Sequence, residues 1–217
     1  MRRNLLVLTF ALCAGCTNSR QAKDLRARGA GLTQEDTAQD TAQGKLREAL
    51  RAIRAESQHY FSLAALPSRK QLQQAAEACN GDVWRQMTPL ERFFVFGISS
   101  KIRAAAGPAT VAEAYCAALR VMPADYWGMP GSLDTPQAHE LLDLGRAAQP
   151  CLRAQLADST PLVFKEGEAN VLTEEFSWTI SDLAASFLAA VSSVHFDARR
   201  TPAERQAMRQ QLAHGTK

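Results

Sequence analysis

The feature of the sequence that most constrains the fold is a series of helix-start signatures between residues 68 and 204. In a capping box, the hydroxyl of a Ser or Thr accepts a hydrogen bond from the backbone amide three residues later. The Glu or Gln side chain at that later position accepts a hydrogen bond from the backbone amide of the Ser or Thr. Four sites carry this pattern, namely Ser68 with Gln71, Thr88 with Glu91, Thr110 with Glu113, and Thr201 with Glu204. Proline follows Thr88, Thr135 and Thr201 at the first helical position, where its missing amide costs nothing. The series predicts a chain built of helices.

The spacing of the apolar residues agrees with the capping boxes. Segments 93–102 and 183–194 are apolar around most of a helix circumference. Such a helix lowers its free energy only when others surround it, so we expect these two segments at the centre of the core. No sustained strand alternation is present, although Pro161 to Phe164 is a candidate for a short extended piece. The sequence therefore predicts an all-α fold, a helical bundle or short stack of about eight helices.

The chain begins with the three parts of a secretory signal. Two arginines follow Met1, residues 5–12 are apolar except for one threonine, and small residues precede Cys16. An apolar run of this length is too short to cross a hydrocarbon core about 30 Å thick. The segment is therefore expected to be a targeting signal and not a spanning helix.

This start resembles the signal of bacterial lipoproteins. Their lipobox has an aliphatic residue, two small residues and the cysteine that is lipidated; here residues 13–16 have the sequence CAGC, with cysteine in place of the usual leucine. The resemblance implies that residues 1–15 are removed and that Cys16 carries a diacylglyceryl thioether and an N-linked fatty acid such as palmitate. Thr17 stands where an aspartate would favour the inner membrane, so the resemblance implies the outer membrane and a protein facing the periplasm.

The segment after Cys16 is expected to be a tether. Residues 17–43 contain only two large aliphatic residues, Leu25 and Leu32. Such a stretch cannot bury enough apolar surface to offset the entropy of ordering it. The predicted organisation is a signal peptide at 1–15, an acylated N-terminus and flexible tether at 16–43, and an α-helical domain at 44–217.

The charge of the chain excludes one class of partner. Lys and Arg number 25 against 22 Asp and Glu, and without Arg2 and Arg3 of the signal the basic residues number 23. A nearly balanced charge lacks the basic footprint of a nucleic-acid-binding protein. The 46% apolar content also excludes disordered and collagen-like chains.

Residues 141–158 resemble one HEAT-like helical repeat unit. An apolar helix ends at Leu144 and Gly145, Pro150 opens the next helix, and Asp158 follows it. Glycine is favoured just after a helix, where the backbone takes a left-handed conformation, and proline is favoured in the first turn of a helix. No second copy occurs at a fixed period. The resemblance implies a short HEAT-like stack of helix pairs with a protein-binding surface, and no catalytic residues to carry over.

Three cysteines, Cys79, Cys116 and Cys151, follow the expected anchor in a compartment that would be oxidising. We expect two of these three cysteines to form a disulfide and the third to be a buried thiol. Counting gives the three pairings equal weight. Cys79 with Cys116 is one candidate, because both can flank the apolar helix between them, and three buried thiols are the remaining alternative.

Residues 122–131 form the loop most suited to an interaction. The loop contains two prolines, two glycines, Tyr126 and Trp127. Large aromatic side chains supply contact area at small entropy cost, so Tyr126 and Trp127 are candidate anchors for a protein partner. The alternative is that Trp127 fills the core beneath a long connection.

Catalytic and metal-binding motifs are incomplete. The segment around Ser99 lacks the second glycine of a nucleophile elbow and lies in a helical pattern. His139, Glu140 and Asp143 fall one residue short of the zinc-protease helix motif, without an identifiable third ligand. We therefore expect neither a metal nor a cofactor.

These features together predict a lipid-anchored envelope protein that faces the periplasm and binds another protein or envelope component. Two alternatives stay open. One is an envelope hydrolase centred on His139, Glu140 and Asp143. The other is a carrier that holds an apolar ligand in a cavity between helices.

Overall fold

The computed structural model describes residues 34–60, 62–79, 83–165 and 167–214. The predicted signal peptide and Cys16 lie outside the described residues. The chain divides into two compact units, residues 1–39 and 40–217, and the account below concerns the second unit.

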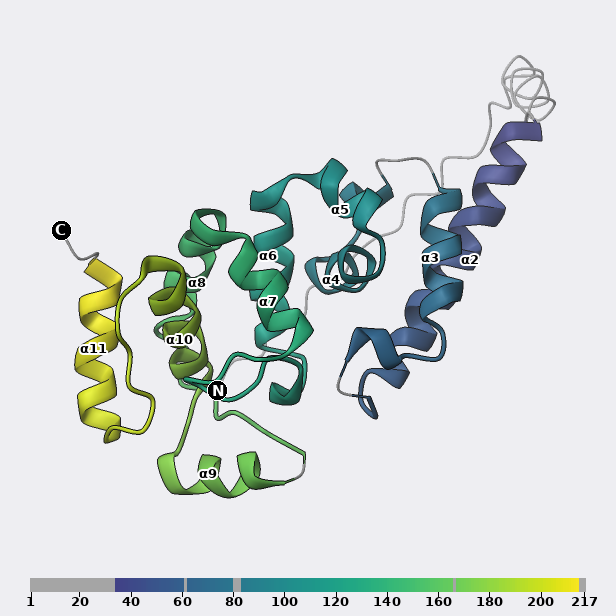
Figure 1. Cartoon of the computed structure of the whole chain (residues 1–217). Helices are drawn as coiled ribbons and strands as arrows, with labels where there is room; N and C mark the ends of the chain where they lie inside the picture. Colours follow the sequence, from purple (N-terminus) through teal and green to yellow (C-terminus); the bar gives the residue numbers. More distant parts are fainter. Residues whose placement is uncertain (1–33, 61, 80–82, 166, 215–217) are drawn as a thin grey trace, which may run out of the picture. The chain divides into compact units, whose positions relative to one another are not determined.

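The described residues form ten α-helices and four short 3-10 helices (Figure 1). The α-helices are α2 (Gln34–Glu56), α3 (Arg69–Ala78), α4 (Pro89–Ile98), α5 (Ser100–Ala106), α6 (Pro108–Leu119), α7 (Pro136–Asp143), α8 (Gln149–Gln155), α9 (Glu168–Phe176), α10 (Ile180–Ser192) and α11 (Pro202–His214). The 3-10 helices are η1 (Leu63–Ala65), η2 (Val83–Gln86), η3 (Ala124–Tyr126) and η4 (Gly145–Ala148). The predicted all-α class is confirmed.

Strand-like pairing in the described part of the chain is limited to two isolated antiparallel bridges. One bridge joins Pro161 to Thr179, at the short extended piece that the sequence suggests. The other joins Met129 to Ser132.

Helix α2 begins at Gln34, ten residues before the predicted start of the helical domain at residue 44. Residues 34–43 include three Gln, two Ala and one Glu, which have good helix propensity. They continue directly into the buried positions Leu46, Leu50 and Ile53. Once those positions fix a helix, each added residue gains a hydrogen bond without a new nucleus, and the helix extends toward the N-terminus. The rest of the predicted tether lies outside the described residues.

Two of the four predicted capping boxes are present. The Thr88 amide donates to a Glu91 carboxylate oxygen at 2.8 Å, and the Glu91 amide donates to the Thr88 hydroxyl at 3.4 Å. Thr201 and Glu204 make the same pair of bonds at the start of α11, at 3.0 and 3.4 Å. Thr135 caps α7 by accepting from the Ala138 amide at 3.1 Å.

The other two boxes do not form. Ser68 precedes α3, but its hydroxyl donates to the Glu56 carboxylate at 2.5 Å in place of capping the helix. Thr110 lies inside α6, which starts at Pro108 after Gly107. Gly107 has a φ of +78°, a conformation that glycine adopts without strain, and proline is favoured in the first turn that follows.

Both predicted central helices are buried. Four consecutive residues of α4, Phe93, Phe94, Val95 and Phe96, are at most 1% exposed. In α10 every residue from Ile180 to Ala189 is buried. Helix α4 packs against α6, and α10 packs against α8 and α11. The predicted segment 93–102 is interrupted at Ser99, whose hydroxyl caps α5.

A buried ion pair joins α11 to α10. The Asp182 carboxylate accepts from the Arg205 guanidinium at 3.0 Å, and both side chains are 1% exposed. Arg209 also pairs with Asp182. The other Asp182 oxygen accepts from the Thr179 amide at 3.0 Å and completes a capping box for α10. A buried charge is retained only when it is paired in this way.

The turn in the HEAT-like segment has the predicted backbone. Gly145 follows α7 with a φ of +52°, and Pro150 lies in the first turn of α8. Helix α7, η4 and α8 contact α10, and η4 and α8 also contact α6.

Candidate functional site

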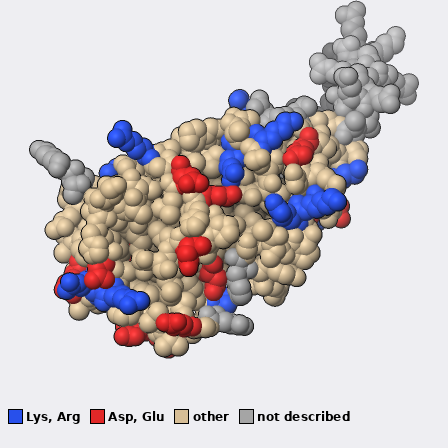
Figure 2. Space-filling view, viewed as in Figure 1, with Lys and Arg blue, Asp and Glu red and all other residues tan. Residues whose placement is uncertain are grey.

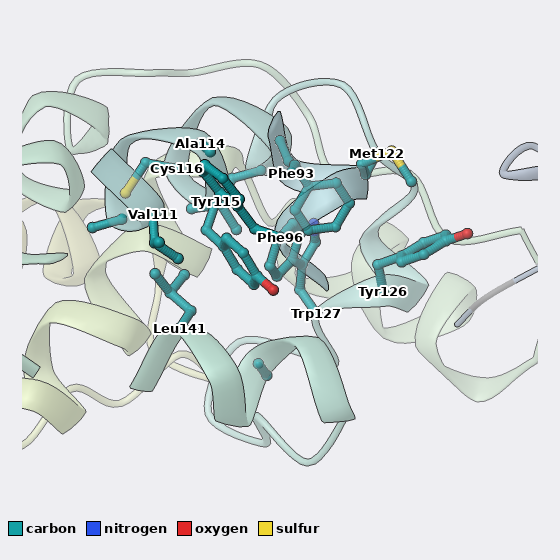
Figure 3. Close-up of a cluster of buried hydrophobic side chains, with 14 of the residues drawn as sticks. Phe93, Phe96, Val111, Ala114, Tyr115, Cys116, Met122, Tyr126, Trp127 and Leu141 are labelled. Carbon is teal, nitrogen blue, oxygen red and sulfur yellow. The ribbon is translucent and has the colours of Figure 1, made fainter. Parts of the chain in front are cut away.

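The predicted interaction loop turns its aromatic residues inward, so the assignment of Tyr126 and Trp127 as surface anchors is wrong. Both side chains are fully buried. The Trp127 ring lies among Phe93, Tyr115 and Phe187, with centroid distances of 5.5, 6.2 and 6.2 Å. Figure 3 shows Phe93 and Tyr115 in the same buried cluster as Trp127. The helical turn η3 directs these side chains into the core, where burial of a large ring is strongly favourable. Trp127 therefore fills the core, which was the alternative interpretation.

The disulfide joins Cys116 to Cys151, so the candidate pair Cys79 with Cys116 is wrong. The Cα atoms of Cys116 and Cys151 are 6.0 Å apart. Helix α6 packs directly against α8, which brings these two positions together, whereas Cys79 is the C-cap of α3, which packs against α4. Cys79 is a buried free thiol, and burial raises its pKa.

The cluster proposed for the enzyme alternative is divided by the fold. His139 and Asp143 are exposed on α7. Glu140 instead pairs with Arg103 at 2.7 Å and accepts a hydrogen bond from the Tyr115 hydroxyl. Burial and the Glu140 charge raise the Tyr115 pKa. Glu140 thus joins α7 to α5 and α6. Within the described ranges, no group of three or more His, Cys, Asp or Glu residues is placed to hold a metal ion.

The most distinctive surface feature is a groove between the chain that follows α6 and the extended segment 160–165. We call it the valine groove, because two of the four exposed large hydrophobic residues in the described chain, Val121 and Val163, line it. Val121 is 54% exposed and Val163 is 68% exposed. The hollow measures about 290 Å³. Its other lining residues include Arg120, Met122, Pro123, Pro161 and Lys165.

Backbone hydrogen bonds fix both walls of the valine groove. The Ala124 amide donates to the Val163 carbonyl at 3.2 Å, which ties one wall to the other. The Leu162 amide donates to the Trp178 carbonyl at 2.9 Å, and the Ile180 amide donates to the Thr160 carbonyl at the same distance. The groove is therefore preformed and does not depend on a mobile loop.

Charged groups lie at the rim of the groove. Arg120 pairs with Asp158 at 2.7 Å. Burial acts to raise the Asp158 pKa, but hydrogen bonds from Thr160 and the Arg120 charge outweigh it and hold the pKa below its ordinary value. Figure 2 shows acidic and basic side chains interspersed over the visible face, in keeping with the nearly balanced charge. An apolar centre with a polar rim is the usual composition of a protein-binding surface.

Sequence analysis missed this groove, although one signal for it is present. Residues 161–165 alternate between exposed and buried, with Leu162 and Phe164 directed inward and Val163 outward. This is the period of a strand, and it places an apolar residue on the solvent face. The position of Val121 gives no such signal, because its exposure depends on how the chain leaves α6.

No helix in the described part of the chain has the length and apolar content needed to cross a bilayer. Comparison of the chain with protein-family models, curated proteins and solved structures found no match.

Proposed function

We propose that this protein is a lipid-anchored envelope lipoprotein that faces the periplasm and binds a partner protein through the valine groove. The exposure of Val121 and Val163 on two walls fixed by backbone bonds is the observation that carries the binding proposal. Exposed apolar side chains that gather in one place and are rimmed by polar groups mark interaction surfaces more often than scattered single ones do.

A rigid groove favours binding for a second reason. Association costs free energy whenever loops and side chains must be ordered on binding. Because hydrogen bonds already hold the groove backbone, that cost is small at this surface. Valine also has little rotamer freedom to lose.

Two observations support the proposed compartment. Residues 13–16 match the lipobox in its last three positions. The Cys116–Cys151 disulfide suits a protein that folds outside the reducing cytosol. The proposed outer-membrane location rests on Thr17 alone.

Site-specific photo-crosslinking in cells tests the binding proposal. A photo-reactive residue replaces Val163 in the full chain, and a matched chain carries it at Val171 of α9, which is 64% exposed but lies outside the groove. We expect a discrete protein adduct from position 163, none from position 171, and loss of the adduct when Val121→Asp is added. Identical adducts from both positions, or no adduct from position 163, would contradict the proposal.

A further inference from the structure

Helix α2 presents three arginines that the valine groove does not use. Arg47, Arg51 and Arg54 are spaced by four and then three residues, which places them on one face of the helix. All three are exposed. Their guanidinium groups have no hydrogen bond or ion pair with any residue that the structure describes. Three exposed arginines on one helical face form a positive local surface.

These arginines border a groove between α2 and the start of α4, which we call the α2 groove. It is a hollow of about 350 Å³ lined by Arg47, Leu50, Arg51, Arg54, Thr88, Leu90, Glu91 and Phe94. A second hollow shares Arg47, Leu50 and Glu91 with it and extends it along α2 toward Gln43. The Glu91 carboxylate, one oxygen of which accepts from the Thr88 amide and hydroxyl, offsets one of the three positive charges and leaves the groove with a net positive charge.

The depth of the apolar residues indicates what kind of occupant fits. Leu50 is 7% exposed, Phe94 is 1% exposed and only Leu90 is partly exposed, so little apolar area is available to a partner helix. Attraction at this groove must therefore come mainly from charge. The planar guanidinium group of arginine can donate two parallel hydrogen bonds to the oxygen atoms of one phosphate group. It is also easier to desolvate than the ammonium group of lysine.

We propose that the α2 groove docks onto the anionic phospholipid surface of the membrane in which the protein is anchored, an inference that rests on the proposed lipid anchor. Only 17 residues separate Cys16 from Gln34. The flexible tether that the sequence predicts there would span about 20 to 25 Å, so the anchor would keep α2 at a high effective concentration near lipid phosphates. A lipid chain and a basic patch together give a more stable attachment than either alone.

Vesicle sedimentation of the mature chain, residues 16–217 with Cys16→Ser, tests the docking without the acyl chains. The probe is a vesicle of phosphatidylglycerol and phosphatidylethanolamine, compared with a neutral vesicle of phosphatidylcholine and phosphatidylethanolamine. One variant carries Arg47→Gln, Arg51→Gln and Arg54→Gln. The matched control, Lys101→Gln, Arg146→Gln and Arg199→Gln, removes the same charge from exposed sites elsewhere.

Each arginine near an anionic surface strengthens binding about fivefold, so we expect the α2 variant to bind anionic vesicles about 100-fold more weakly and the control about as well as the parent. The single substitution Arg51→Gln should cost about fivefold. Equal losses in the two triple variants, or no preference of the parent for anionic vesicles, would overturn the docking proposal. Since the assay uses an unacylated chain, its result is independent of whether Cys16 is lipidated, which a mass measurement decides separately.

Discussion

The indole of Trp127 meets the ring of Phe187 edge-on, with the ring centroids 6.2 Å apart and the ring planes at 88°. This contact joins the connection after α6 to α10. Because Phe93 of α4 lies on the same indole, Trp127 links the two helices that the sequence predicts to be central.

Truncating Phe187 to alanine should lower the free energy of unfolding by about 3 to 5 kcal/mol, and Trp127→Ala should cost a similar amount, because each removes a fully buried ring. The double variant should cost less than the sum by about 0.5 to 1.5 kcal/mol. Val171→Ala is the exposed control and should cost less than about 0.5 kcal/mol. Chemical denaturation of the mature Cys16→Ser chain measures all four. Strict additivity would mean that the two rings do not interact.

The disulfide assignment predicts the number of reactive thiols. In denaturant without reductant, the mature Cys16→Ser chain should show one thiol, Cys79, and three after reduction. In the native state Cys79 should react slowly, because burial both shields it and raises its pKa. Finding Cys116 or Cys151 free in the oxidised protein would refute the pairing.

Replacing Cys116 and Cys151 together by alanine should destabilise the domain by about 4 kcal/mol, from the chain entropy released over a separation of 35 residues. The double variant should unfold the same with and without reductant, whereas the control Cys79→Ala, which keeps the disulfide, should be destabilised by reductant as the parent is. Thermal unfolding under both conditions measures the difference.

The parts of this fold that follow from neighbouring residues could be predicted, whereas those that depend on packing could not. The Thr88 capping box forms because all its atoms lie within one turn. Helices α4 and α10 are apolar around most of their circumference. One neighbouring helix cannot cover so much apolar surface, so both are surrounded by several helices and buried. By contrast, the same aromatic composition at Trp127 suits either a core or a surface, and only the turn at η3 decides between them.

Long-range pairs explain the remaining errors. The pairing of Cys116 with Cys151 depends on the packing of α6 against α8. The spacing of the cysteines in the sequence does not reveal that packing. The ion pair of Asp182 and Arg205 joins two helices, and neither residue has a distinctive neighbour in the sequence. The valine groove likewise arises from two segments that meet only in the folded chain.

Asp182→Ala should destabilise the domain by about 3 to 5 kcal/mol, because it leaves the Arg205 guanidinium buried without its counter-ion. Asp197→Ala is a matched control that breaks an ion pair with Arg200, whose side chain is 59% exposed, and it should cost at most about 1 kcal/mol. Urea unfolding of both variants tests this expectation. Similar small losses would mean that α11 is not held by the Asp182 pair.

The Asp158 carboxylate should make stability depend on pH. Because its pKa is lower in the folded chain, it contributes stability above its ordinary pKa of about 4, and that contribution is lost as the pH falls through the lowered value. Asp158→Asn should therefore be less stable than the parent at pH 7, and the difference should shrink below about pH 4. Unfolding curves over this range test the sign. A difference that grows with acid would contradict the pairing with Arg120.

The proposed function depends most on the lipid anchor, and intact mass spectrometry of protein from the membrane fraction tests the anchor most directly. We expect a chain that begins at Cys16 and is heavier than its sequence by a diacylglyceryl group and one N-linked fatty acid. A Cys16→Ser chain that also carries Arg47→Gln, Arg51→Gln and Arg54→Gln should leave the membrane fraction. An unmodified N-terminus, or retention of that quadruple variant in the membrane fraction, would contradict the lipid anchor.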